Sequence, residues 1–172
     1  MIRDLQDKEY WLSGSFDSVS LFPGEMPIEI FDKTEKAVPY AERCVAHYNA
    51  LGEDKALLEA IENGLAAFLF FMHEECDWDE ETADRIEAAI RAYRSGQSLL
   101  PFLAKPRLYI HLPGDSDEVG YLIEAECPWE PEHMCDIILR GHVLKYVGPG
   151  AGFTPWEDDG TYYLIWNEVD HS

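Results

Sequence analysis

The stretch CPWEPEHMCDIILRGHVLKYVG, residues 127–148, decides the fold and raises the question of a metal or catalytic site. Two runs of β-branched and aromatic residues flank Arg140-Gly141, a pattern typical of a β-hairpin with a two-residue turn. In that register Leu139 lies opposite His142, and side chains alternate between the two faces of the sheet. The face predicted to meet the helices carries His133, Cys135, Ile137, Leu139, His142, Leu144 and Tyr146.

Three zones extend this prediction to the whole chain. Residues 10–32 hold strand-like runs on either side of a Pro-Gly turn, and residues 106–169 hold five more: RLYIHL, VGYLIEAEC, HMCDIILR, HVLKYVG and TYYLIWNEV. Between them, at about 38–95, apolar residues recur at helical spacing. This order predicts a single α+β domain over residues 1–172, with an antiparallel sheet from both chain ends packed on two or three central helices.

Capping residues mark the helix starts. Asp54 and Asp79 precede two of the apolar stripes and are predicted N-caps, because a carboxylate accepts hydrogen bonds from the free amides of the first helical turn. Glu80 and Glu81 follow at the positive end of the helix dipole. Helix capping and the helix dipole therefore account for part of the acidic run EECDWDEE, residues 74–81, and partner binding is the alternative explanation for it.

Two thiols and an imidazole offer an alternative reading of the opening stretch. If the chain turns back at PWEP, Cys127, His133 and Cys135 approach each other on the core side, and His111, His73 or water would complete a zinc site. The spacing C-x5-H-x-C matches no structural zinc pattern, however, and cysteine is often buried only to pack. We therefore expect no metal and no cofactor, and keep an enzyme or metal-binding domain centred on these three residues as the alternative.

Enzyme motifs are missing from the sequence. There is no phosphate-binding glycine motif, no G-x-S-x-G and no pair of histidines at metalloprotease spacing. A nucleophilic cysteine needs an electropositive setting, whereas the surroundings of Cys127 and Cys135 are acidic. Residues 148–152, GPGAG, indicate a wide turn, with a ligand-binding loop as the alternative. We expect a protein that is not an enzyme.

Charge is the strongest feature of the composition. The chain has 34 acidic and 13 basic residues, a net charge of −21, and no lysine or arginine after Lys145. Such a protein repels nucleic acid and anionic membranes and attracts basic proteins. The alternative is that the acidic surface only keeps the protein soluble.

The N-terminal sequence and the cysteines bear on location. MIRDLQDKEYW has no apolar stretch of the kind found in signal peptides, and the longest apolar run, Leu65–Met72, is too short to cross a bilayer. Four cysteines without an export signal are expected to be thiols. The sequence therefore predicts a cytoplasmic protein.

A family resemblance adds to this reading. WEPEHMCDIIL followed by GHVLKYVG resembles the W-x-x-E-H-G strand and the V-G-ended strand of small bacterial domains of unknown function, some of which are immunity proteins of polymorphic toxin systems. The matching residues are Trp129, Glu132, His133 and Val147-Gly148, while Met134 stands where the family has glycine. The resemblance implies a non-catalytic inhibitor whose partner is a basic toxin domain.

Acidic and aromatic side chains that lie together in the sequence are the candidate partner-binding residues. Carboxylates would occupy the place of the nucleic acid on a nuclease toxin, and tryptophans often anchor interfaces. A tryptophan that only closes the core is the alternative for each of them. The predicted residues, all expected to be exposed, are Asp77, Trp78, Asp79, Glu130, Glu132, Trp156, Asp158 and Asp159.

Overall fold

A seven-stranded sheet organises the computed structural model, which describes residues 1–162. Its strands follow each other in sequence order, and all neighbours are antiparallel except β3 and β4, which pair in parallel. The strands are β1 Arg3–Asp7, β2 Leu12–Ser18, β3 Gly24–Ile30, β4 Ala104–Ile110, β5 Gly120–Cys127, β6 Glu130–Arg140 and β7 Val143–Pro149. The predicted α+β domain is confirmed.

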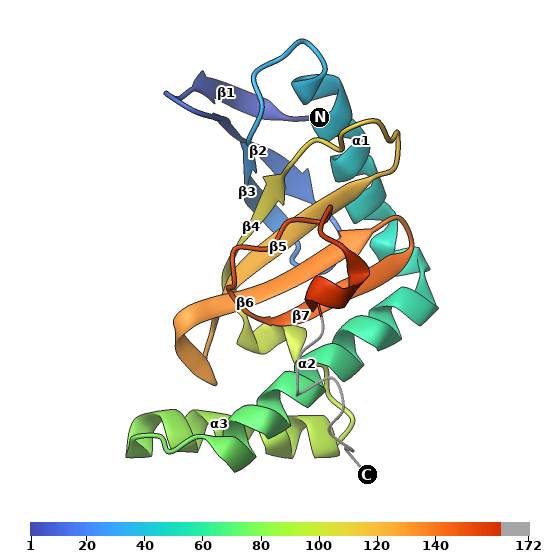
Figure 1. Cartoon of the computed structure of the whole chain (residues 1–172). Coiled ribbons are helices and arrows are strands. Elements are labelled where there is room, and N and C mark those ends of the chain that lie inside the picture. Colours follow the sequence, from blue (N-terminus) through green and yellow to red (C-terminus); the bar gives the residue numbers. More distant parts are fainter. Residues whose placement is uncertain (163–172) are drawn as a thin grey trace.

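Three α-helices connect β3 to β4 within the described part of the chain: α1 Ala37–Ala50, α2 Lys55–Glu75 and α3 Glu80–Arg94. Short 3-10 turns lie at Leu51–Glu53, Leu100–Phe102 and Asp159–Tyr162. Both predicted N-caps are confirmed, since Asp54 accepts a hydrogen bond from the Leu57 amide and Asp79 from the Thr82 amide. Figure 1 shows α1 behind the sheet, α2 crossing near β7, and α3 lying along α2.

The main core lies between the helices and one face of the sheet. Phe68 of α2 packs edge-on against Trp129, whose side chain is fully buried, and Cys135, Ile137 and Val147 join the same cluster. Full burial of a phenylalanine side chain such as that of Phe68 contributes roughly 1.5–3 kcal/mol to folding. The face of the sheet toward the helices is therefore closed by packing.

The opposite face is covered in part by the segment after β7. Leu122, Ile138, Tyr146 and Tyr162 form a second, smaller cluster there. Arg140 holds this segment by donating hydrogen bonds to the carbonyl oxygens of residues 155 and 157, at 2.6 and 2.7 Å. Figure 1 shows the segment crossing in front of the last strands. Residues 1–162 leave part of this face uncovered, and the pocket described below lies on it.

The hairpin of β6 and β7 forms, but its register differs from the prediction. Arg140 pairs with Val143, so Gly141-His142 form the turn, one residue later than predicted. A register shift after Ile138 then places Tyr146 opposite Ile138, on the face without helices. The prediction that Tyr146 faces the helices is wrong, because the irregularity in the ladder reverses the alternation of side chains.

Two other features were not predicted, and one prediction falls beyond the described residues. The first strand, β1, was missed because it is short and exposed, and the parallel pairing of β3 with β4 departs from an all-antiparallel sheet. The run predicted as a strand at 161–169 begins with Thr161 and Tyr162, which belong to a 3-10 turn. The rest of that run lies outside the described residues.

Helix α2 alone, among the described residues, is long and apolar enough to cross a membrane by length and composition. Half of the most apolar 18-residue stretch of this helix is buried inside the molecule. The core helix of a globular protein meets the same criteria, so this helix is weak evidence for a membrane span.

Candidate functional site

A pocket opens on the uncovered part of the sheet face that carries no helix. It has a volume of about 430 Å³ and is lined by side chains from β4, β5 and β6 and by the glycine-rich segment after β7. Phe31, directly after β3, and Phe153, after β7, also line it. The turn at residues 148–152 thus contributes Gly150 and Gly152 to a pocket wall.

Two carboxyl groups face each other in this pocket. Glu124 of β5 and Asp136 of β6 are directly paired across the antiparallel ladder, and both line the pocket. Asp136 is only 2% exposed, and its Oδ1 atom has no hydrogen-bond partner among residues 1–162. Burial, and next the charge of Glu124, raise the pKa of Asp136 to about 7. Perturbed carboxyl groups in pockets are typical of functional sites.

Aromatic rings form the wall beside the carboxyl pair. The ring of Phe31 stacks on His111, with centroids 4.7 Å apart and an interplanar angle of 7°, and lies 5.7 Å from the ring of Tyr109. Tyr109 donates a hydrogen bond of 3.1 Å to Glu124. Burial raises the pKa of Tyr109 to about 12 and lowers that of His111, so the phenol is protonated and the imidazole neutral at pH 7.

The start of β6 is held by a buried carboxylate. Glu130 is 3% exposed and accepts hydrogen bonds from the amides of Glu132 and His133 and from His133 Nδ1. The expectation that Glu130 is exposed is therefore wrong. The side-chain atoms of Glu130, Glu132 and His133 that could bind a metal ion lie within 4.8 Å of one another. Both oxygens of Glu130, however, already accept hydrogen bonds from the backbone amides of residues 132 and 133.

The proposed trio of Cys127, His133 and Cys135 does not come together. The two thiols are buried in the core, whereas 61% of the His133 side chain is exposed. Met134 has a φ of +68°, which breaks the alternation that would have placed His133 beside Cys135. The suggested further ligands are also elsewhere: His73 pairs with Glu87 on the helices, and His111 lines the pocket on the other sheet face.

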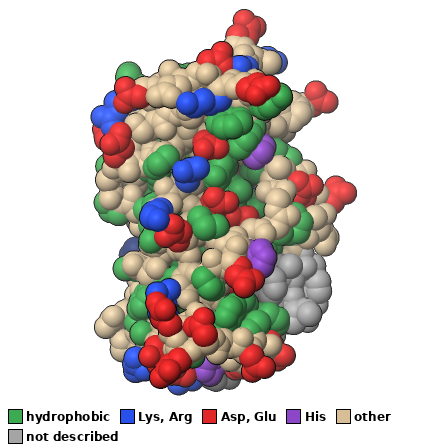
Figure 2. Space-filling model, turned by 90° about the vertical axis from the view of Figure 1, so that its left-hand side faces the viewer, with side chains coloured by type: hydrophobic (Ala, Val, Ile, Leu, Met, Phe, Trp, Pro, Cys, Tyr) green, Lys and Arg blue, Asp and Glu red, His purple; other side chains and the backbone are tan. Residues whose placement is uncertain are grey.

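Acidic side chains gather where α2 meets α3. We call this region the acidic end, and it comprises the exposed residues Glu74, Glu75, Asp77, Asp79, Glu80, Glu81, Asp84 and Glu132. In Figure 2, red side chains are numerous at the lower end of the molecule, with lysines and arginines among them, and further acidic side chains lie at the upper end and along the side. A hollow at the acidic end is lined entirely by Asp79, Glu80, Glu81 and Asp84.

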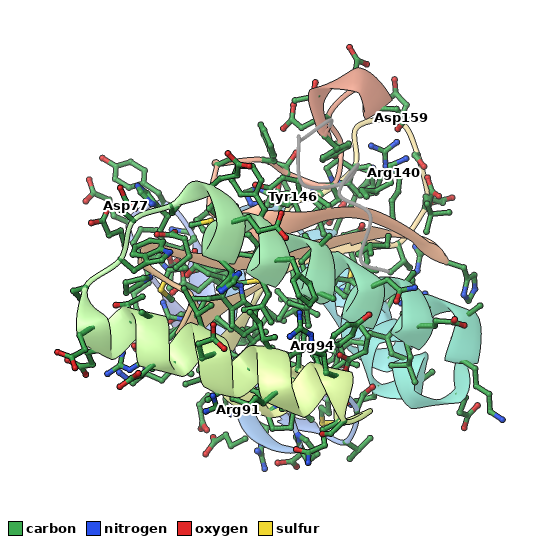
Figure 3. All side chains as sticks on the ribbon, turned by 90° about the horizontal axis from the view of Figure 1, so that it is seen from below. Asp77, Arg91, Arg94, Arg140, Tyr146 and Asp159 are labelled. Carbon is green, nitrogen blue, oxygen red and sulfur yellow. The ribbon has the colours of Figure 1, made fainter. Side chains whose placement is uncertain are left out.

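Two distant parts of the sequence meet at the acidic end. The pKa of Cys76 is raised by burial and then by Glu130, Glu75 and Asp77, which shows that the start of β6 lies near the α2–α3 connection. Arg85 pairs with Glu81. The two ends of α3 carry opposite charges. Glu80 and Glu81 lie in its first turn, whereas Arg91 and Arg94 lie in its last turn (Figure 3).

The predicted partner-binding residues fall into two groups. Asp77, Trp78, Asp79, Glu130 and Glu132 lie at or beside the acidic end, with Trp78 half-buried and donating to the Met72 carbonyl oxygen. Asp159 lies far from Asp77, near Arg140 (Figure 3), and Asp158 precedes it in the chain.

The second group has contacts within the fold. Trp156 packs over Gly120 and donates a hydrogen bond of 2.7 Å to the carbonyl oxygen of His111. Asp159 pairs with Lys145 at 2.6 Å and with Arg140 at 3.6 Å. Asp158 is exposed. These contacts fasten the segment after β7 onto the sheet.

The family described as a domain of unknown function, DUF6985, matches residues 1–154. The chain belongs to the DUF6985 family. The matched region contains all seven strands, the three α-helices and the carboxyl pair. Comparison of this DUF6985 member with curated proteins and with solved structures gave no significant match.

Sequence reasoning missed Glu124, Asp136 and Tyr109. A signal was present, because each carboxylate interrupts an otherwise apolar strand, in LIEAEC and in MCDIIL. An acidic residue between apolar residues alternates onto the other sheet face, where it needs a partner or a function. Their convergence depended on the strand register, which sequence alone did not supply.

Proposed function

We propose that this protein is a non-catalytic binding protein of the bacterial cytoplasm that holds a basic protein at its acidic end, as an immunity-type inhibitor holds a toxin. The observation that carries the proposal is the cluster of exposed carboxylates that the α2–α3 connection and the start of β6 form together. The resemblance of Trp129, Glu132 and His133 to a motif of immunity-type domains supports it.

Charge at this end acts mainly on the rate of association. Exposed carboxylates of one sign steer an oppositely charged partner and raise the association rate constant, an effect that salt screens over about 8–10 Å. Exposed ion pairs add little affinity by themselves. Half-buried Trp78, beside Asp77 and Asp79, offers the aromatic surface that interfaces use as an anchor.

The proposal is tested with the purified product of the gene adjacent to that of this protein. One variant neutralises three exposed residues of the acidic end: Asp77→Asn, Glu80→Gln and Asp84→Asn. The matched control neutralises three exposed residues of the β4–β5 loop: Asp115→Asn, Asp117→Asn and Glu118→Gln. Both variants lose the same charge, so a difference between them reports position and not net charge.

We expect the first variant to lose about tenfold in association rate constant at low salt and to show a weaker dependence on salt. The control should stay within about twofold of the unmodified protein. Equal losses in both variants would mean that only net charge matters. A partner that binds but ignores the acidic end, or no binding of the adjacent gene product, would remove the support for this function.

A further inference from the structure

The pocket on the open sheet face combines anionic groups with aromatic walls. Its two carboxyl groups, Glu124 and Asp136, come from facing strand positions, and Phe31, Tyr109 and Phe153 are among its lining residues. We infer that this pocket binds an organic cation, an alkylammonium or guanidinium group, with Glu124 and Asp136 as the counter-charge. The inference does not depend on the acidic end, which is formed by other residues.

The charge of the pocket is one-sided. Within residues 1–162, its wall contains no lysine or arginine. Arg107 lies directly opposite Glu124 in the β4–β5 ladder, and its Nη1 atom also contacts Glu29 at 3.0 Å and the Tyr109 hydroxyl at 3.5 Å. The histidine at the rim, His133, is engaged by Glu130, and the other one, His111, is held neutral by burial. A cation entering the pocket therefore meets Asp136, which has no basic residue opposite it on either neighbouring strand, beside Glu124, which has Arg107 opposite it on β4.

Asp136 supplies the independent sign of a missing ligand. Buried polar side-chain atoms nearly always have hydrogen-bond partners, whereas Oδ1 of this 2%-exposed residue has none in the described structure. Like charges directly opposite each other also destabilise a sheet, and Asp136 faces Glu124 in this way, whereas Glu124 has Arg107 on its other side. A cation placed against Glu124 would interact with both groups, because facing side chains lie about 4.5–5.5 Å apart at Cβ.

The walls favour an organic cation over a bare metal ion. A pocket of about 430 Å³ matches the size range of small-molecule sites, roughly 300–1,000 Å³. Aromatic faces attract ammonium and guanidinium groups through the ring quadrupole, and the pocket presents the rings of Phe31, Tyr109 and Phe153. A divalent metal would instead require several more oxygen ligands around one point.

Gly150 allows the glycine-rich segment to form the wall beside Asp136. A Cβ atom at this position would lie 2.6 Å from the carbonyl oxygen of His133 and 3.7 Å from Asp136 Oδ2. The Gly150 amide donates a hydrogen bond of 3.0 Å to the same carbonyl. The backbone therefore lies directly against β6, and the Asp136 carboxyl is closed off from water on that side.

The inference is tested by NMR titration of the full chain with methylguanidinium and butylammonium. Urea, a planar and uncharged analogue of guanidinium, is the control ligand, and Mg²⁺ and Ca²⁺ are titrated separately. The N-acetylated and C-amidated peptides Gly-Arg-Gly and Gly-Lys-Gly, which have no free α-amine, distinguish a free amine from a side chain presented by another protein. We expect saturable shifts of the amides of Ala151 and Phe153 with the organic cations and none with urea.

Variants locate the binding. Asp136→Asn and Glu124→Gln should each weaken binding about tenfold, which corresponds to about 1.4 kcal/mol. Asp117→Asn, which removes the same charge from an exposed loop, should leave it unchanged. Thermal melting confirms that each variant is folded. Shifts that do not saturate, equal shifts with urea, tighter binding of the divalent metals, or unchanged binding by Asp136→Asn would each overturn the inference.

Discussion

Glu124 of β5 lies directly opposite Asp136 of β6, so the sheet places two carboxyl groups side by side on the face that the helices leave open. Burial and the neighbouring charge of Glu124 hold the pKa of Asp136 at about 7, well above its ordinary value of 3.8. The fold thus carries a carboxyl group that is partly protonated at neutral pH. Removing its charge should consequently change stability in a defined direction.

Asp136→Asn is expected to stabilise the unliganded protein at pH 8 by roughly 2–4 kcal/mol. The pKa of Asp136 is higher in the folded than in the unfolded chain, so its contribution to stability is fully present below pH 3.8 and is lost as the pH rises through about 7. The advantage of the asparagine variant should therefore shrink toward pH 4. Urea unfolding at pH 4 and pH 8 measures the difference in unfolding free energy between the two proteins. A variant less stable than the unmodified protein at pH 8 would contradict the raised pKa of Asp136.

His47 should make the protein less stable as the pH falls. Its ring lies 5.2 Å from that of His142, and its Nδ1 atom shares a hydrogen bond of 2.9 Å with the Tyr121 hydroxyl. Burial, and then His142, lower the pKa of His47 below 6.5, so the folded state binds fewer protons than the unfolded state near that pH. Stability contributed by neutral His47 is present above pH 6.5 and is lost as the pH falls through that value.

Replacing the neighbouring imidazole tests this coupling. In His142→Gln, NMR titration should show a higher pKa for His47, because one repulsive charge is gone. His73→Gln is the control, since His73 contacts Glu87 on the helices. An unchanged His47 titration in His142→Gln would show that burial alone sets its pKa.

Gly64→Ala should destabilise the protein although alanine favours helices. At an exposed position inside a helix, replacing glycine with alanine raises the free energy of unfolding by about 1 kcal/mol. At Gly64, however, a Cβ atom would lie 2.7 Å from Val147 Cγ2, so α2 could not stay in its present contact with β7. We expect a net loss of about 1–3 kcal/mol in thermal or urea unfolding. Gly52→Ala, with no atom closer than 3.9 Å, is the control and should be close to neutral.

Cysteine alkylation should proceed in a fixed order. Cys76 is the partly exposed thiol, whereas Cys44, Cys127 and Cys135 are buried. Burial and the nearby Glu130, Glu75 and Asp77 raise the pKa of Cys76, so it should react more slowly than a free cysteine and faster in high salt. Mass spectrometry of the labelled protein measures the order. Reaction of Cys135 as fast as Cys76 would contradict the burial of Cys135.

Local signals in the sequence predicted much of the fold. Asp54 and Asp79 cap α2 and α3 as expected because capping depends on residues within one helical turn. The strand runs likewise carry their own alternation. The parallel pairing of β3 with β4 was not predicted, since the whole helical region separates the two strands and no local feature sets their direction.

The candidate pocket was harder to predict for a related reason. Glu124 and Asp136 meet only in one register of β5 and β6, and the face of Tyr146 depends on an irregularity next to Ile138. Sequence reasoning correctly noted acids near Trp129 but expected Glu130 to be exposed. Its carboxylate instead satisfies the amides of residues 132 and 133, a role that becomes visible only with the backbone conformation.

The parallel junction between β3 and β4 divides the sheet into an N-terminal and a C-terminal group of strands. It pairs only Ile28, Glu29 and Ile30 with Leu108, Tyr109 and Ile110, and the stacked rings of Phe31 and His111 span it at the pocket. A ligand bound in the pocket would contact Phe31, which follows β3, and residues of β4, β5 and β6, and would thereby connect the two groups of strands. A bound amine would then oppose separation of β3 from β4. The liganded protein would resist mechanical unfolding and proteolysis at this junction more than the free protein.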